Sequence, residues 1–257
     1  MHIIDRLPDG YHQIETCYYP VPWSDVLEVV PAEKFSFTSS GEIIPGNPED
    51  NLCVKAYREI QKNHNLSPIA IHLHKIIPSG AGLGGGSSDA SFCLRILNSV
   101  FDLSCTSEEM ISYAGRLGSD CAFFLEDSPK IGTGKGDLLT RIDINLKNFY
   151  LVIIKPPLHI SSSEAYGLIT PSKPGTSIRN IIREIPITSW KKELVNNFEE
   201  PIFQKYPELK KIKDRLYLKG AVYASMSGSG SSLYGIFTSQ IDLEKEFPGC
   251  NYWAGKL

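Results

Sequence analysis

A run of glycines between a strand-like and a helix-like segment constrains this chain more than any other feature. Residues 78–90 read PSGAGLGGGSSDA, with five glycines among the seven residues 80–86. The preceding residues 69–76 alternate apolar and polar side chains, which predicts a strand, and residues 87–100 predict a helix. Five glycines cost conformational entropy that a simple connecting turn does not require. We therefore expect bare backbone to approach a ligand here.

A phosphate group fits this loop best. Successive backbone N–H groups and the positive end of a helix dipole bind phosphate oxygens, and Ser87 and Ser88 add hydroxyls for phosphate or a metal ion. No lysine follows the glycines, so the loop is not a P-loop. Gly80, Gly82 and Gly85 match the dinucleotide fingerprint. The residues after the helix leave no room for the strand which that fold needs, so we set the dinucleotide interpretation aside.

The rest of the chain predicts an α+β protein with two lobes. The 257 residues, 42% of them hydrophobic, suffice for one large or two modest cores. A seam near residues 140–149 predicts domains over residues 1–145 and 146–257. Helices are expected at residues 51–64, 106–118 (opened by a capping box) and within 176–217. Strands are expected within residues 13–44, with turns at 20–22 and 39–41, and at 149–156 and in the C-terminal part of 224–237.

Composition excludes several classes of function. The net charge of −3, with no basic run, argues against a nucleic-acid partner. No apolar run approaches the roughly 20 residues that span a bilayer, and no signal segment is evident. The six cysteines form no C-x-x-C pair, so we predict neither a zinc site nor disulfides, in a reduced, cytoplasmic, soluble protein. His72 and His74 share a strand face that we expect to be solvated rather than metal-binding.

The glycine loop resembles the P-x-G-x-G-L-G-[SG]-[SG]-S-x-A motif of the GHMP kinases, the galactokinase–homoserine kinase–mevalonate kinase superfamily. The resemblance implies an N-terminal mixed-sheet lobe with a left-handed βαβ crossover, a C-terminal ferredoxin-like lobe, and the use of Mg²⁺ and ATP. It also implies that the loop holds the ATP phosphates at a helix N-terminus. The residues implied in this role are Pro78, Gly80, Ala81, Gly82, Leu83, Gly84, Gly85, Gly86, Ser87 and Ser88.

Two further segments resemble one branch of that superfamily. Its members phosphorylate the 2-hydroxyl of 4-diphosphocytidyl-2-C-methyl-D-erythritol in the non-mevalonate route to isoprenoid precursors. Residues 6–16, RLPDGYHQIET, resemble its R-P-D-G-Y-H segment, which implies that Tyr11 stacks on the cytosine and His12 hydrogen-bonds to it. Residues 160–166, ISSSEAY, imply Tyr166 as a second aromatic ring against the base. Taken alone, Tyr11 and His12 fit a surface turn better than a binding site, and Tyr166 fits a buried helix aromatic nearly as well.

The remaining motifs concern catalysis. Residues 117–124, LGSDCAFF, resemble the segment of the branch that carries its catalytic carboxylate, so Asp120 is expected to accept the proton of the substrate hydroxyl. Asp120 is also a candidate helix N-cap, which is compatible with that role. Residues 224–232, ASMSGSGSS, resemble the third superfamily motif and imply that Gly228 and Ser229 lie in a loop that closes over the site. The expected partner is a small molecule, and the protein is expected to be a monomer or homodimer.

The sequence departs from the family pattern at its start. The family opens with a strand, [PA]-[AS]-K-[IL]-N-[LI]-x-L, whose lysine pairs with the catalytic aspartate, whereas this chain begins MHII directly after that point. We expect either that Met1 is an internal methionine of a longer bacterial protein, which the intact downstream motifs favour, or that the chain is a genuine short form. The chain as given is expected to be weakly active or inactive and less stable than the full form. Two alternatives remain: the chain is another GHMP small-molecule kinase, or it is a non-catalytic nucleotide-binding protein.

Overall fold

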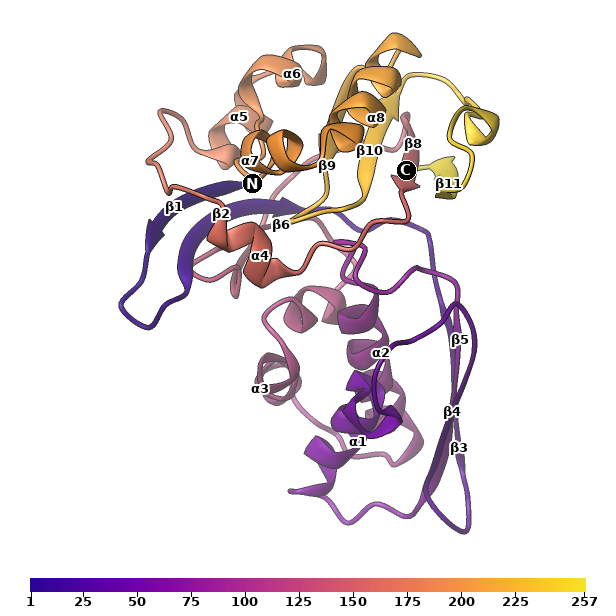
Figure 1. The fold of residues 1–257 in the computed structure, drawn as a ribbon. Coiled ribbons are helices and arrows are strands. Elements are labelled where there is room, and N and C mark those ends of the chain that lie inside the picture. The colour runs from indigo at the N-terminus through magenta and orange to yellow at the C-terminus, as the bar shows by residue number, and fades with distance from the viewer. The chain divides into compact units, whose positions relative to one another are not determined.

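A computed structural model describes residues 1–257 (Figure 1). Its contacts divide the chain into two compact units. The first unit comprises residues 1–22, 80–83 and 128–257, and the second comprises residues 23–79 and 84–127. The boundary predicted between residues 145 and 146 separates sequence domains rather than these units, and it stays a prediction.

The second unit contains a three-stranded mixed sheet. Its strands are β3 (Val26–Pro31), β4 (Ser36–Gly41) and β5 (Ile69–Lys75), in the order β3-β5-β4. β5 pairs antiparallel with β3 and parallel with β4, so the chain from β4 to β5 makes the βαβ crossover. The predicted turn at residues 39–41 is wrong, because these residues continue β4 to the pairing of Gly41 with Lys75. Parallel pairing with a buried strand here outweighs the weak strand preference of serine.

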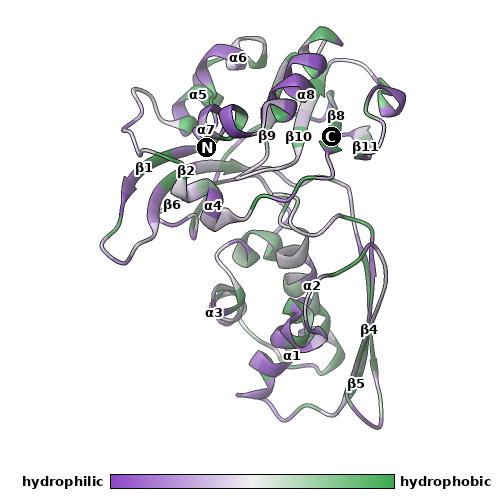
Figure 2. Ribbon diagram, in the orientation of Figure 1, coloured by the Kyte–Doolittle hydropathy of each residue, from purple (hydrophilic) through white to green (hydrophobic).

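Helices pack with that sheet to form the core of the second unit (Figure 2). They are η1 (Pro48–Asp50), α1 (Leu52–Gln61), α2 (Gly85–Val100), α3 (Ser107–Leu117) and η2 (Cys121–Leu125). The predicted capping box of α3 is confirmed: Thr106 Oγ1 accepts from the N–H of Glu109, and the Glu109 carboxylate accepts from the N–H of Thr106. The side chain of Asn51 likewise caps α1 by accepting from the N–H of Cys53.

The first unit contains two antiparallel sheets. One is ordered β1-β2-β6-β7, from β1 (His2–Arg6), β2 (His12–Tyr18), β6 (Lys130–Thr133) and β7 (Leu138–Arg141). The other is ordered β11-β8-β10-β9, from β8 (Tyr150–Lys155), β9 (Tyr223–Met226), β10 (Leu233–Phe237) and β11 (Asn251–Lys256). Counted along the chain, these four strands lie in the order 4-1-3-2, which is the predicted ferredoxin-like arrangement.

The helices of the first unit lie mostly between β8 and β9. They are α4 (Ser162–Gly167), α5 (Ile178–Glu184), η3 (Ile187–Ser189), α6 (Trp190–Glu193), α7 (Glu199–Lys205) and α8 (Pro207–Leu218), and η4 (Glu244–Glu246) follows β10. Leu209 and Leu216 on α8 are fully buried in one cluster with Val152 and Ile154 of β8. Burying side chains of this size contributes about 1.5–3 kcal/mol each, so this cluster fixes α8 on the sheet.

Candidate active site

The first glycine loop, residues 78–88, has the conformation that its composition requires. Gly80, Gly82 and Gly84 have φ of +64°, +72° and +69°, in the left-handed region that favours glycine. A Cβ at Gly82 would lie 2.5 Å from the carbonyl oxygen of Ser227, and a Cβ at Gly84 would lie 2.8 Å from the ring of Phe124. Space as well as backbone conformation therefore excludes a side chain at both positions.

The loop enters α2 without a side-chain cap. α2 begins at Gly85, two residues before the predicted start, and its N-cap residue Gly84 has no side chain to bind the first N–H groups. Ser87 and Ser88 lie in the first turn and are half-buried. The other predicted phosphate-binding residues differ in exposure: Pro78 and Ala81 are buried, Leu83 is half-buried and Gly86 is exposed. Open N–H groups at the positive end of a helix dipole form an anion site.

Asp120, the predicted catalytic residue, directly precedes η2, which packs against α2. The hydroxyl of Ser91 lies 2.7 Å from the carbonyl oxygen of Cys121 and 2.8 Å from that of Ser87, so it ties the residue after Asp120 to the start of α2. Asp120 occupies the N-cap position of η2, but its side chain makes no capping hydrogen bond there. Its backbone is already helical, with φ −84° and ψ −15°, whereas capping residues are usually extended.

A buried lysine and two aspartates, which the sequence analysis missed, lie against the first turn of α2. Lys75 Nζ donates to Oδ2 of Asp25 at 2.5 Å and to Oδ2 of Asp89 at 2.7 Å. The three side chains are 3%, 3% and 7% exposed. A Cβ on Gly85 would lie 3.1 Å from Lys75 Nζ, so the ammonium lies beside the first residue of α2. One signal was available: strict alternation along residues 69–75 places Lys75 on the buried face.

The two aspartates of this cluster differ in proton affinity. Burial raises the pKa of Asp89 to about 7, although the Lys75 ammonium opposes this. Burial would also raise the pKa of Asp25, but hydrogen bonds from Lys75 and from the N–H groups of Ile76 and Ile77 outweigh it and lower that pKa. Asp25 thus keeps its charge, and the cluster takes up its next proton at Asp89.

The structure brings together two of the three predicted cytidine-binding residues. The rings of His12 and Tyr166 stack with centroids 4.7 Å apart and an interplanar angle of 22°. Burial, and then the positive charge of Arg6, lower the pKa of His12, which favours the neutral imidazole. Tyr11 is 61% exposed, and the ammonium of Lys135 lies 4.3 Å from its ring centroid. Tyr166 therefore faces His12, and a sandwich of Tyr11 and Tyr166 around a base stays a prediction.

The second glycine loop, residues 227–232, contacts the first one although about 150 residues separate them. Ser227 Oγ donates to the carbonyl oxygen of Gly82 at 2.7 Å. The N–H of Ser232 donates to the carbonyl oxygen of Ala81 at 3.2 Å. Gly228, with φ of +55°, and Ser229 lie at the turn of this loop. The predicted phosphate loop and the predicted closing loop are thus hydrogen-bonded to each other within the first unit.

No group of three or more His, Cys, Asp or Glu side chains in the chain could hold a metal ion. His72 and His74 lie on the outer face of β5, where the hydroxyl of Ser40 lies 3.0 Å from Nε2 of His72 and 2.9 Å from Nδ1 of His74. No helix is both long and apolar enough to cross a bilayer. All six cysteines are free thiols.

Comparisons with known proteins agree with the motifs. The family model of the GHMP kinases N terminal domain matches residues 51–127, and that of the GHMP kinases C terminal domain matches residues 181–247. A crystal structure of 4-(cytidine 5'-diphospho)-2C-methyl-D-erythritol kinase superposes with a TM-score of 0.81 at 27% identity, covering 99% of this chain and 93% of that one. Homoserine kinase from Cytophaga hutchinsonii, at 15% identity and a TM-score of 0.69, shares the fold, covering 96% of this chain and 88% of that one.

Bacterial relatives named 4-diphosphocytidyl-2-C-methyl-D-erythritol kinase are much closer in sequence. The protein from Cytophaga hutchinsonii is 46% identical over 241 residues, which cover 93% of this chain and 89% of the relative. The protein from Bacteroides thetaiotaomicron is 46% identical over 260 residues, which cover 100% of this chain and 94% of the relative. Together with the two glycine loops and the aspartate held beside α2, this likeness over nearly the whole length shows that the chain belongs to the 4-diphosphocytidyl-2-C-methyl-D-erythritol kinase family of the GHMP kinases.

Proposed function

We propose that this protein transfers the γ-phosphoryl group of ATP to the 2-hydroxyl of 4-diphosphocytidyl-2-C-methyl-D-erythritol, a step of the non-mevalonate route to isoprenoid precursors. The observation that carries this proposal is the 46% identity to kinases of that name across nearly the full chain. Six free thiols support a reducing compartment such as the cytoplasm. We expect a monomer or homodimer.

The first glycine loop and the N-terminus of α2 would hold the ATP phosphates. Backbone N–H groups at this end have no side-chain cap, and the dipole of a 16-residue helix favours negative charge there. Asp120 would accept the proton of the 2-hydroxyl. The hydroxyl oxygen of the substrate bonds to the γ-phosphorus of ATP as the bond between that phosphorus and ADP breaks. Positioned bases of this kind contribute about 10²–10⁴-fold to the rate. Asp120 is held beside α2 through Ser91 and Cys121.

Mg²⁺ would enter with ATP. In phosphotransferases this ion is bound largely by substrate phosphates and by one or two protein oxygens, so a cage of protein ligands is unnecessary. The hydroxyl of Ser88 in the first turn of α2 is the candidate protein ligand. When bound, the ion neutralises the charge on the transferring phosphoryl group.

Tyr11, His12 and Tyr166 would hold the cytidine part of the substrate. Aromatic faces stack on bases, and a neutral imidazole offers one donor and one acceptor to a base edge. The stacked pair of His12 and Tyr166 supports this assignment, because both rings already lie in one place within the first unit. Gly228 and Ser229 of the second glycine loop would close on the bound phosphates.

The test is ADP release with three phosphate acceptors in parallel: 4-diphosphocytidyl-2-C-methyl-D-erythritol, mevalonate and homoserine. We expect turnover with the first acceptor alone. Faster turnover with mevalonate or homoserine would favour another GHMP small-molecule kinase. Calorimetric binding of ATP and of the cytidine compound, without turnover of any acceptor, would favour a non-catalytic nucleotide-binding protein.

A further inference from the structure

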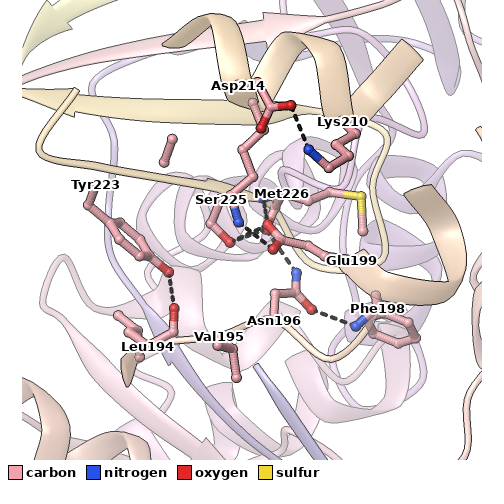
Figure 3. A network of polar contacts seen from close by, with 12 residues as sticks. Leu194, Val195, Asn196, Phe198, Glu199, Lys210, Asp214, Tyr223, Ser225 and Met226 are labelled. Atoms are coloured by element: carbon pink, nitrogen blue, oxygen red, sulfur yellow. Dashed lines mark hydrogen bonds and ion pairs between the residues drawn. The ribbon is translucent and has the colours of Figure 1, made fainter. Parts of the chain in front are cut away.

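The segment Asn196–Glu199, where α7 begins, contacts the strand that leads into the second glycine loop (Figure 3). This segment belongs to none of the residues assigned above to catalysis or binding. Its partners on β9 and in the loop lie about 30 residues further along the chain. It is therefore a tertiary support for the loop rather than part of the turn itself.

Asn196 satisfies two carbonyl groups of the loop region at once. Its Nδ2 donates to the carbonyl oxygens of Met226 and Gly228, each at 2.9 Å, and its Oδ1 accepts from the N–H of Phe198 at 3.1 Å. Asn196 is only 5% exposed. Because the nitrogen faces two acceptors and the oxygen faces a donor, the network fixes the orientation of the amide. No other residue type of this size can make all three contacts.

Glu199 binds the other backbone polar group of the same residue, the N–H of Met226. Its Oε1 accepts from the N–H of Met226 at 2.8 Å and from the hydroxyl of Ser225 at 3.0 Å. Its Oε2 pairs with the ammonium of Lys213 at 2.5 Å. Both backbone groups of Met226 are thus bound by side chains of the segment Asn196–Glu199, so the last residue of β9, directly before the second glycine loop, is held in place.

The same segment also supports the aromatic pair. The buried ring of Phe198 packs edge-on against the ring of Tyr166, with ring centroids 4.9 Å apart. Tyr166 in turn stacks on His12. On the other side, the loop held by Asn196 donates through Ser227 to Gly82 of the first glycine loop. One short segment therefore contacts both Tyr166 of the predicted cytidine site and the second glycine loop, within the first unit.

We propose that Asn196 is a positioning residue for phosphoryl transfer: its amide sets the conformation of the second glycine loop and, through Ser227, of the first. This inference rests on the proposed function. The variant Asn196→Asp keeps the size and the acceptor but replaces both donors by a carboxylate oxygen that faces two carbonyls. Loss of positioning predicts a fall in kcat of about 10–100-fold, because small displacements of reacting groups are that costly.

The neighbouring asparagine supplies the matched control. Asn197 accepts from the N–H of Ile3 through Oδ1 at 2.8 Å, so Asn197→Asp keeps its contact and does not touch the loop. Both variants are compared with the wild type well below their melting temperatures, by kcat, by KM for each substrate and by hydrogen exchange of the peptide 227–232. We expect N196D alone to lower kcat and to speed exchange in that peptide.

The outcomes separate this inference from the proposed function. Absence of turnover in the wild type would count against the proposed function. Faster loop exchange in N196D alone would still show that Asn196 holds the second glycine loop in place. A folded N196D with wild-type kcat and wild-type exchange would overturn the inference. The variant Asn196→Ala, which also removes both donors, repeats the test if N196D does not fold, and unchanged kcat and exchange in a folded N196A would overturn the inference equally.

Discussion

The ammonium of Lys75 lies 2.7 Å from the carboxylate of Asp89, and these side chains are 3% and 7% exposed under the first turn of α2. Lys75→Met would leave Asp25 and Asp89 buried without a cation. Breaking a buried ion pair in this way costs about 3–5 kcal/mol in the free energy of unfolding, which urea titration measures. Lys62→Met removes a pair whose lysine is 65% exposed, and it should cost less than about 1 kcal/mol. Equal losses in the free energy of unfolding for the two variants would contradict the buried position of Lys75.

The same cluster predicts how stability depends on pH. Asp89 keeps its proton up to about pH 7 in the folded protein, against an ordinary pKa of 3.8. Between these values the folded state binds more protons than the unfolded state, so the free energy of unfolding should fall as pH rises through this range. Asp25 has a lowered pKa and therefore contributes stability that is lost only as the pH falls below about 4. The nearby thiol of Cys53 stays neutral, because its contact with Cys93 and burial raise its pKa.

The variant Asp89→Asn isolates this effect, since an amide cannot titrate. Unfolding midpoints in urea between pH 5 and pH 8 should fall with pH in the wild type and change less in D89N. Parallel pH profiles for the two proteins would show that Asp89 is not the group responsible.

Asp120→Asn should lower kcat by about 10²–10⁴-fold with little change in either KM, because the amide cannot accept the hydroxyl proton. Steady-state kinetics with saturating ATP give both constants. The matched variant Asp127→Asn changes an exposed aspartate seven residues further on and should retain wild-type kcat. An equal kcat for D120N and the wild type would remove Asp120 from the mechanism.

Gly84→Ala tests the first glycine loop. The new Cβ would meet the ring of Phe124 at 2.8 Å and the backbone has φ of +69°, so we expect a loss of about 1–3 kcal/mol in stability and a higher KM for ATP. Gly115 lies within α3, and a Cβ added there would have nothing within 4 Å. Gly115→Ala should therefore raise the free energy of unfolding by about 0.5–1 kcal/mol. Thermal melts and ATP titrations distinguish the two variants, and a neutral G84A would argue against the described loop conformation.

Tyr166→Leu should raise KM for the cytidine substrate and leave KM for ATP unchanged. Base stacking on an aromatic ring is worth about 1–3 kcal/mol, which corresponds to a change of roughly 5–150-fold. Tyr166 also packs on Phe198, so the folded fraction of the variant is checked by circular dichroism. Equal increases in both KM values would indicate a general loss of structure rather than a lost base contact.

Local signals predicted much of this architecture. The capping box at Thr106 and Glu109 and the alternation along β5 depend on neighbouring residues, and both appear as expected. The contacts that join distant segments could not be found this way. The hydrogen bond from Ser227 to Gly82 and the two from Asn196 depend on how the strands of the first unit pair, which no local pattern specifies.

The burial of single side chains was also hard to predict. Lys75 continues the inward face of an apolar strand, and a lysine there is stable only because Asp25 and Asp89 arrive from other elements. Tyr11, His12 and Tyr166 were each identified from motifs, but the stacking of Tyr166 on His12 depends on the placement of α4 beside β2.

The most direct test is to incubate the protein with MgATP and 4-diphosphocytidyl-2-C-methyl-D-erythritol and to follow the acceptor by mass spectrometry and phosphorus NMR. The account predicts equimolar ADP and an acceptor that is heavier by one phosphoryl group, with a new phosphate monoester on the 2-hydroxyl. An unchanged acceptor beside active, folded protein, or a phosphate on a different hydroxyl, would contradict it.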